Sequence, residues 1–203
     1  ECLIENVYVS GTVSGIQQVG GIGGIFAKGT VRNCYADVKV IGASRAGGIV
    51  AEPRNAVVVE NCFATGTLYS TGNAGGIAGG LNGNNPTIKG CIAWNEQIDG
   101  EPVSGRVIGW QSNTYTKATD CYAKKDMIIA WGPNKGMTGA DANTAGTYDW
   151  GNNKTAICHG ITTENSVDAA KKIGWSTDIW DLSGVTPLRS EERRVGKECR
   201  SRW

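Results

Sequence analysis

Two short motifs recur along the first 126 residues at a common spacing, and this repeat constrains the fold more than any other feature of the sequence. The first motif is Asn-Cys-(Tyr/Phe) or a close variant, whose central residues are 27, 28, 29 and 30 positions apart. The second is a Gly-Gly-Ile signature that begins at Gly20, Gly47 and Gly75, with a degraded copy at Gly105. A repeat of about 28 residues is typical of a solenoid, in which each unit contacts only its neighbours.

Each repeat favours short strands separated by tight turns. Runs such as Val57–Ala64 have the length of a strand, and clusters of Gly, Asn, Ser and Thr separate them. Glycine makes up 30 of the 203 residues, about twice its usual share, which indicates repeated turns. One unit of this size cannot bury its own apolar face. We therefore predict an all-β fold over residues 1–126, a right-handed β-solenoid (β-helix) of about five repeats.

Stacking the repeats in register places like residues above one another in ladders. Two structural ladders are predicted to be Ile22/Ile49/Ile77/Val107 and Cys34/Cys62/Cys91/Cys121, and a third is Tyr8/Tyr35/Phe63/Ile92/Tyr122. Strand side chains alternate between faces, so the third ladder is expected to face outward. Its aromatic members are candidates for stacking on the sugar rings of a ligand. The alternative is that they pack against a loop or the cap.

At this point the pattern resembles a known family of repeats. Gly-Gly-Ile-x-(Gly/Ala) followed by Asn-Cys-(Tyr/Phe)-Ala-x-Gly is similar to the GLUG-motif repeats of many large bacterial surface and secreted proteins, and the match covers residues 4–126. Gly90, Arg106 and Asp120 depart from the motif in the last two copies. The resemblance implies a β-solenoid in an extracellular or cell-surface bacterial protein. It implies much less about activity, because such repeats also occur beside the protease domain of immunoglobulin A1-cleaving metallopeptidases without supplying its catalytic residues.

The repeat ends after residue 126, and the remaining chain has a different character. Tryptophans at 131, 150, 175 and 180 predict an irregular Trp-rich cap over residues 127–188, since the open end of a solenoid must be covered. Within it we predict one or two helical turns over Ser166–Ile173, capped by Ser166. Residues 174–188 are similar to the segment that often follows the last GLUG-type repeat. Residues 189–203 hold nine charged residues and resemble a translated vector or adapter sequence, so we expect a disordered tail without function.

The charge balance and residue inventory exclude several function classes. Twenty basic against 19 acidic residues predict no nucleic-acid partner, and no apolar run approaches the roughly 20 residues of a membrane span. A single histidine, His159, and the lack of any Cys-x-x-Cys argue against a zinc site, so we expect no metal and no cofactor. The cysteine ladder is interpreted as a column of small buried side chains, with disulfides or a redox role as the alternative.

No set of catalytic residues converges within the repeats, so the catalytic residues are predicted to be none. Cys158 and His159 are adjacent, but sequence neighbours rarely present both groups to one substrate. The acidic residues considered for carboxylate catalysis are Asp37, Asp99, Asp120 and Asp126, which fall in different columns or near the end of the array. Asp120 is interpreted as a turn residue equivalent to Asn33 and Asn61. The Asp and Asn residues of 138–153 match no calcium loop.

These observations predict a non-catalytic repeat module of a bacterial cell-surface or secreted protein, acting in adhesion, in ligand display or as a spacer. The expected partners are a host glycan, a polysaccharide or a surface protein. The chain begins within a repeat, which predicts further repeats of the parent chain upstream. The alternative function is that of a polysaccharide-acting β-helix enzyme, a lyase or hydrolase.

Overall fold

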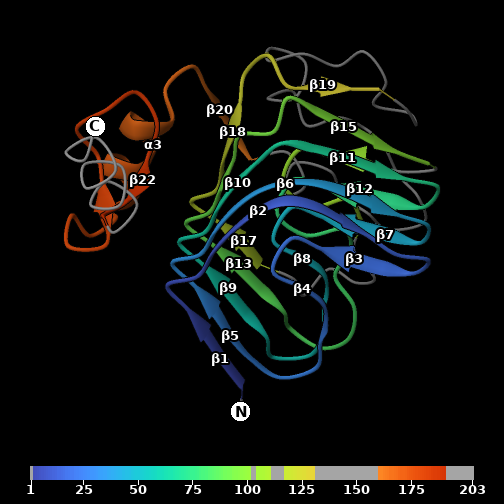
Figure 1. Ribbon diagram of the computed structural model, residues 1–203. Helices are drawn as coiled ribbons and strands as arrows, with labels where there is room; N and C mark the ends of the chain where they lie inside the picture. Colours follow the sequence, from blue (N-terminus) through green and yellow to red (C-terminus); the bar gives the residue numbers. More distant parts are fainter. Residues whose placement is uncertain (1, 102–103, 111–116, 131–159, 191–203) are drawn as a thin grey trace, which may run out of the picture.

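Short parallel strands stack into a β-solenoid, as the repeat predicts (Figure 1). The solenoid has about four turns, where about five repeats were expected. The computed structural model describes residues 2–101, 104–110, 117–130 and 160–190. The chain winds upward from the N-terminal coil, and the segment after residue 160 lies beside the stack (Figure 1). In this described part of the chain, no helix has the length and apolar character needed to cross a membrane.

One face of the solenoid is a five-stranded sheet that takes one strand from each of five successive repeats. In spatial order its strands are β1 (Cys2–Glu5), β5 (Gly29–Arg32), β9 (Val58–Glu60), β13 (Thr87–Lys89) and β17 (Lys117–Thr119). The register places Ile4 beside Val31 and Val31 beside Val59. Because every pairing is parallel and in register, the apolar residues form continuous columns.

The largest sheet has nine strands. Its long strand β6 pairs with two shorter strands of the next coil. Its members are β2 (Tyr8–Ser14), β6 (Tyr35–Gly42), β10 (Phe63–Thr65), β11 (Thr67–Ser70), β14 (Ile92–Ala93), β15 (Gln97–Gly100), β18 (Tyr122–Lys124), β19 (Ile128–Ile129) and β20 (Ile161–Thr163). Gly66, with φ +87°, separates β10 from β11. A side chain there is strained by this backbone conformation, so the sequence needs glycine at the bend.

The remaining solenoid strands form two smaller parallel sheets. One contains β3 (Gln18–Gly20), β7 (Arg45–Gly47), β12 (Asn73–Gly75) and β16 (Ser104–Gly105), and the other pairs β4 (Gly23–Phe26) with β8 (Val50–Pro53). The coils approach each other closely at the glycine motif. A Cβ atom on Gly48 would lie 2.0 Å from the carbonyl oxygen of Gly76. No side chain fits at that distance, which explains the glycine in successive repeats.

Each copy of the cysteine motif begins with a residue in the left-handed conformation. Asn6, Asn33, Asn61 and Asp120 have φ between +52° and +59°, and Gly90 has φ +58°. Asn, Asp and Gly are the residues that tolerate this conformation best. Gly90 and Asp120 therefore depart from the motif in sequence while keeping its backbone.

The segment that follows β20 forms a cap on one side of the solenoid. It contains the helix α3 (Ser166–Ile173) and the antiparallel pair β21 (Trp180–Asp181) and β22 (Leu188–Arg189). The predicted helix is present, but the prediction of Ser166 as its cap is wrong. Asn165 has the extended backbone of a cap residue, and its Oδ1 accepts hydrogen bonds from the amides of Val167 and Asp168 at 2.9 and 3.1 Å. Residues 131–159, with Trp131, Trp150 and the predicted 138–153 loop, lie outside the described residues.

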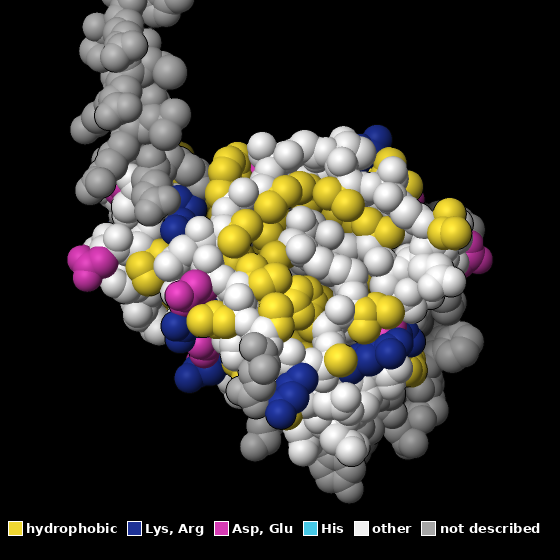
Figure 2. Space-filling view, turned by 60° about the horizontal axis from the view of Figure 1, so that its bottom comes forward, with side chains coloured by type: hydrophobic (Ala, Val, Ile, Leu, Met, Phe, Trp, Pro, Cys, Tyr) yellow, Lys and Arg dark blue, Asp and Glu magenta, His cyan; other side chains and the backbone are white. Residues whose placement is uncertain are grey.

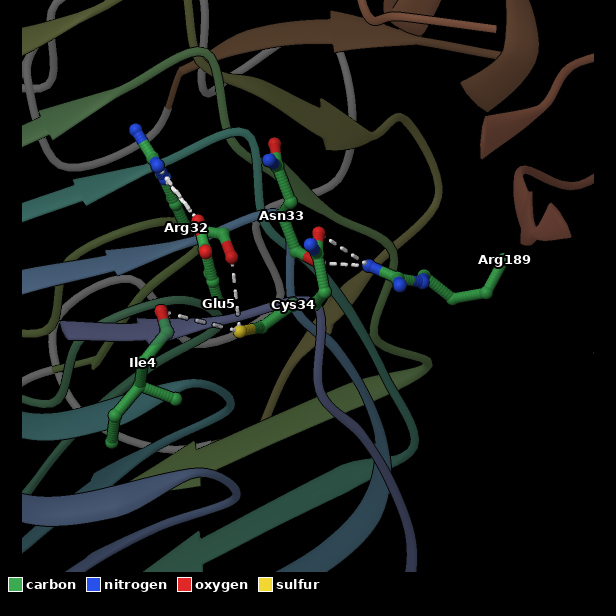
Figure 3. A network of polar contacts seen from close by, with 7 residues as sticks. Ile4, Glu5, Arg32, Asn33, Cys34 and Arg189 are labelled. Carbon is green, nitrogen blue, oxygen red and sulfur yellow. Dashed lines mark hydrogen bonds and ion pairs between the residues drawn. The ribbon is translucent and has the colours of Figure 1, made fainter. Parts of the chain in front are cut away.

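Arg189 connects the cap to the first two coils (Figure 3). Its Nη1 donates hydrogen bonds to the carbonyl oxygen of Asn33 at 2.6 Å and to Oδ1 of Asn6 at 3.2 Å, and the residue is 5% exposed. The predicted tail boundary is therefore corrected: Arg189 belongs to β22 and to the fold, because its guanidinium has acceptors on two coils. Residues 191–203 of the predicted tail lie outside the described residues.

Candidate functional site

The outward aromatic ladder is covered by the cap. Tyr35 is 7% exposed and Phe63 is fully buried, and the Phe63 ring meets the edge of Trp175 with centroids 6.4 Å apart. Trp175 in turn stacks on Trp180 at 4.4 Å. The expectation that Tyr35 and Phe63 stack on a ligand is corrected, since the cap occupies the faces that a sugar ring would need. Tyr8 at the end of the stack remains 44% exposed, and Tyr122 is half-buried.

The isoleucine and cysteine ladders point into the solenoid. Ile49, Ile77 and Val107 are fully buried, and Ile22 packs against the same core from the first coil. The four thiols lie on successive coils, and each S–H donates to the carbonyl oxygen two residues earlier at 3.2 to 3.4 Å. The four are Cys34, Cys62, Cys91 and Cys121, and all are free thiols. A repeated local hydrogen bond thus satisfies each thiol inside an apolar column.

The environment of the thiol column disfavours ionisation. Burial away from water raises the pKa of Cys62 and Cys91 well above the ordinary 9.0. Cys34 is the member of the column nearest the N-terminus, and the pKa of its thiol is lowered, first by its hydrogen bond with Cys62 and further by the charge of Arg189. Among the described residues, no group of three His, Cys, Asp or Glu side chains is placed to hold a metal ion. Cys158 and His159 lie outside those residues.

A buried carboxylate joins three coils on another side of the solenoid. Glu52 is fully buried on β8, and four donors surround its two oxygens. Arg54 Nε lies at 2.7 Å, Asn82 Nδ2 at 2.9 Å and Gln18 Nε2 at 3.2 Å, and Arg45 forms an ion pair with the same group. Arg45 also lies over the Trp110 ring, 4.8 Å from its centroid.

The charge of Glu52 is stabilised by these partners despite its burial. Desolvation raises the pKa of the carboxyl, but the hydrogen bonds from Arg54, Asn82 and Arg45 outweigh it and lower the pKa from 4.5 to about 2. All four acceptor positions of the carboxylate are used, so the group has no capacity left for a substrate or a metal. We interpret it as a structural connection between coils.

The outer face of the largest sheet carries a groove of about 300 Å³ that crosses three coils. The register pairs Ile41 of β6, Tyr69 of β11 and Asp99 of β15 side by side. These residues alternate with the buried Val40, Leu68 and Ile98, so the same strand geometry that fills the core turns them outward. The full lining is Ile41, Gly42, Tyr69, Ser70, Thr71, Asp99 and Glu101.

The groove combines an aromatic ring with charged and hydroxyl groups. The half-buried Tyr69 ring lies at its centre, and Lys39 Nζ is 5.3 Å from the ring centroid. Asp99 and Glu101 place two carboxylates, which are hydrogen-bond acceptors, in the lining. Such a mixture, an apolar surface with a few polar groups around it, is characteristic of binding sites.

Reasoning from the sequence alone did not identify Tyr69 as a candidate. The alternation of the Thr67–Ser70 run indicates that Tyr69 faces outward, but the sequence does not show which outward column the cap leaves uncovered. Asp99 was considered only as a catalytic acid. Asp37 accepts a hydrogen bond from Thr65 at 2.7 Å, Asp120 occupies its left-handed turn, and Asp126 lies 3.7 Å from Lys124 Nζ, so the structure does not bring these acids together with Asp99.

Comparisons with known proteins bear on the fold. No protein-family model matches the chain, and no curated protein matches its sequence, so the GLUG relationship stays a resemblance. Among solved structures, the chain is similar to a candidate immunoglobulin A1 protease from Bacteroides ovatus, with a TM-score of 0.70 and 25% sequence identity. The match covers 93% of this chain and 57% of that protein. The chain thus spans little more than half the length of the relative that shares its fold.

Proposed function

We propose that the chain is a non-catalytic β-solenoid module of a bacterial cell-surface or secreted protein, and that it binds glycans in the Tyr69 groove. The observation that carries the proposal is the aromatic ring of Tyr69, set in a groove between carboxylates and hydroxyl groups. Sugar rings have apolar faces that pack on aromatic rings and hydroxyl edges that hydrogen-bond to carboxylates.

Two related observations support a setting outside the cell. The repeats resemble GLUG-motif repeats of bacterial surface and secreted proteins, and the fold is shared with a Bacteroides ovatus protein named for immunoglobulin A1, an antibody found outside bacterial cells. Both point to a bacterial protein that meets host molecules.

The charges of the groove favour neutral glycans and amino sugars over acidic ones. Asp99 and Glu101 lie in the lining, and Lys39 beside the ring offsets one of these two negative charges. A polymer of uronic acids would bring like charge to the remaining carboxylate, which is unfavourable. We therefore expect mannan, a neutral polymer, to bind more tightly than polygalacturonate.

Affinity electrophoresis through gels that contain mannan, gastric mucin or polygalacturonate tests the proposal. We expect Tyr69→Ala to abolish retardation while Tyr8→Ala and Tyr122→Ala, which remove the exposed and the half-buried tyrosine of the aromatic ladder, leave it unchanged. Retardation lost in the Tyr8 and Tyr122 variants but kept in Tyr69→Ala would move the site to the ladder. No retardation in any gel would leave a spacer as the better function.

The second candidate is a glycan-cleaving enzyme, because two carboxylates, those of Asp99 and Glu101, line the same groove. Pairs of carboxylates about 5 to 9.5 Å apart perform glycoside hydrolysis. Chromatography of the polysaccharides after incubation distinguishes the candidates. Products that disappear in Asp99→Asn would replace the binding function by a catalytic one.

A further inference from the structure

The thiol column repeats one side-chain geometry on four successive coils. Each Sγ has the same two carbonyl oxygens beside it, one from two residues earlier at 3.2 to 3.4 Å and one from the preceding coil at 3.6 to 3.9 Å. The backbones of neighbouring coils are joined at the same place, since the amide of Phe63 donates to the carbonyl oxygen of Cys34 at 2.9 Å. The thiols therefore share one orientation, and each sulfur atom is related to the next by the step from coil to coil.

This step matches the length of two metal–thiolate bonds in line. Neighbouring in-register strands lie about 4.8 Å apart, and the shared orientation gives neighbouring sulfur atoms about the same separation. A bond from a thiolate to zinc, a d10 ion, is about 2.3 Å long, so two such bonds in line span about 4.6 Å. An ion midway between two sulfur atoms thus reaches both of them without a change in the spacing of the coils.

The linear arrangement of the thiols selects the kind of ion. Zinc takes four ligands at the corners of a tetrahedron, and among the described residues no three His, Cys, Asp or Glu side chains are placed to hold a metal. The expectation of no metal rested on the lack of a zinc site, whereas a two-coordinate ion needs neither His nor a Cys-x-x-Cys pair. Copper(I) and silver(I) accept two ligands on opposite sides, and soft ions of this kind prefer thiolates.

The surroundings of the column also favour a soft ion. All four thiols belong to the apolar core of the stack. Hydrophobic side chains also gather over the end of the stack that the first coil forms (Figure 2). Hard cations such as magnesium keep their water and bind oxygen ligands, so an apolar column of sulfur atoms excludes them.

The first pair of the column, Cys34 and Cys62, has a positive charge beside it. Arg189 Nη1 donates to the carbonyl oxygen of Asn33, the residue directly before Cys34, at 2.6 Å (Figure 3). Two thiolates bridged by a monovalent ion carry one net negative charge, which a nearby guanidinium stabilises. The pKa of the Cys34 thiol is lowered by its hydrogen bond with Cys62 and then by Arg189, so this thiol loses its proton most readily in the column.

The last pair of the column, Cys91 and Cys121, is an internal comparison. Its thiols have the same geometry, but Asp120 directly precedes Cys121 and brings a negative charge that raises the pKa of this thiol, after larger effects of its hydrogen bond with Cys91 and of burial. An anionic complex is disfavoured beside a carboxylate. Charge therefore distinguishes two pairs that spacing alone does not.

We propose that Cys34 and Cys62 form a binding site for a soft monovalent metal ion, copper(I) or silver(I), held in line between the two sulfur atoms. On binding, both S–H bonds break, two metal–sulfur bonds form and two protons pass to the solvent, while the ion keeps its charge of +1. Arg189 balances the negative charge of the bridged thiolates. The site lies inside the stack, so it does not depend on the Tyr69 groove.

Titration of the purified chain with silver(I) tests the site, because silver(I) does not change its oxidation state during the measurement. The reference protein carries Cys2→Ser, Cys158→Ser and Cys199→Ser, which remove the thiols outside the column. We expect the first equivalent of silver to bind with the release of two protons, measured by calorimetry together with a pH titration. A silver ion on one thiol would release one proton.

The matched variants are Cys34→Ser and Cys121→Ser, each of which removes one thiol at one end of the column. We expect Cys34→Ser to weaken binding of the first equivalent about tenfold or more and Cys121→Ser to leave it unchanged. Arg189→Gln should weaken binding as well, whereas Arg189→Lys should retain it because lysine keeps the positive charge. Circular dichroism checks that each variant folds.

Several outcomes overturn the proposal. No binding, one proton released per silver ion, or equal affinities of the Cys34→Ser and Cys121→Ser variants would each remove the bridged pair. An unchanged affinity in Arg189→Gln contradicts the role of Arg189 and with it the choice of the first pair. A Cys34–Cys62 disulfide in the chain isolated without reductant overturns the proposal too, since the column would then be a disulfide site.

Discussion

The coil stack and the cap bury apolar surface in two different ways. The interior of the stack is filled by small and branched residues, such as Val31, Ala64 and Ile77, which repeat from coil to coil. The cap instead covers the aromatic ladder with a second cluster, in which Phe63, Trp175 and Trp180 dominate. The stack depends on repetition at close distance, whereas the cap depends on a few large contacts that occur once. A single substitution should therefore have consequences that differ in kind between the two regions.

The largest effect is expected for Gly48→Ala in the stack. The added methyl group would lie 2.0 Å from the carbonyl oxygen of Gly76 and 2.8 Å from Cβ of Ala64, so the coils must separate. We expect a loss of about 4 kcal/mol or more in the free energy of unfolding, measured by urea denaturation. The control is Gly184→Ala in the cap, where the nearest atom is 3.8 Å away and the change should be small. Equal stabilities of the two variants would refute tight coil spacing as the reason for the glycine motif.

The next effect is expected for Trp175→Ala, which separates the cap from the stack. The indole is 4% exposed, and its Nε1 donates to the carbonyl oxygen of Gly90 at 2.9 Å. Removing a buried aromatic ring costs about 3 to 5 kcal/mol. Because the contact occurs once, hydrogen exchange should show lost protection in α3 with retained protection in β9 and β13. Uniform loss across both regions would show that cap and stack unfold as one unit.

A smaller effect is expected for Glu52→Gln, which weakens the polar connection between coils. Losing charged hydrogen bonds from Arg45 and Arg54 costs about 2 kcal/mol at neutral pH. The folded-state pKa of about 2 lies below the ordinary 4.5, so the contribution of the carboxylate is complete above pH 4.5 and decreases as the pH falls toward 2. Melting temperatures measured from pH 7 to about pH 3 should converge for the two proteins. A constant difference across this range would contradict the assigned role of the charge.

The smallest effect is expected within the thiol column. Cys91→Ala removes one buried sulfur and should cost about 1 kcal/mol at neutral pH. Burial raises the pKa of the Cys91 thiol in the folded state well above the ordinary 9.0. The stability that the neutral thiol contributes is therefore complete below pH 9.0 and is lost as the pH rises from there toward the folded-state pKa. The stability difference between the chain and the variant should therefore shrink above pH 9.

In a thiol-reagent assay the exposed Cys2 should react while Cys91 stays protected. Rapid labelling of Cys91 in the folded protein would contradict the interpretation of the thiol column as closed to solvent.

The repeat in the sequence determined the solenoid by itself. A spacing near 28 residues, with glycine at one place in each unit and Asn before the cysteine, requires in-register coils because a single unit cannot bury its apolar face. The helix at Ser166–Ile173 was also predictable, although its cap was not. Asn165 and Ser166 are both good cap residues, and only the backbone conformation selects between them.

Contacts between distant residues were decided by the tertiary structure alone. The sequence left open that the aromatic ladder packs against the cap, and the structure confirms that alternative. It does not indicate that Trp175 is the residue that meets Phe63, that Arg189 reaches Asn33, or that Glu52 has donors from three coils. The repeat dictates which residues stack, but it does not say which outward face a non-repeating segment covers. The cap covered the aromatic ladder, which had been the predicted ligand site, and the Tyr69 groove is formed by another outward column. The physical reason is that in-register stacking is a local rule, repeated at each coil, whereas the position of the cap depends on the shapes of two surfaces that meet only after folding.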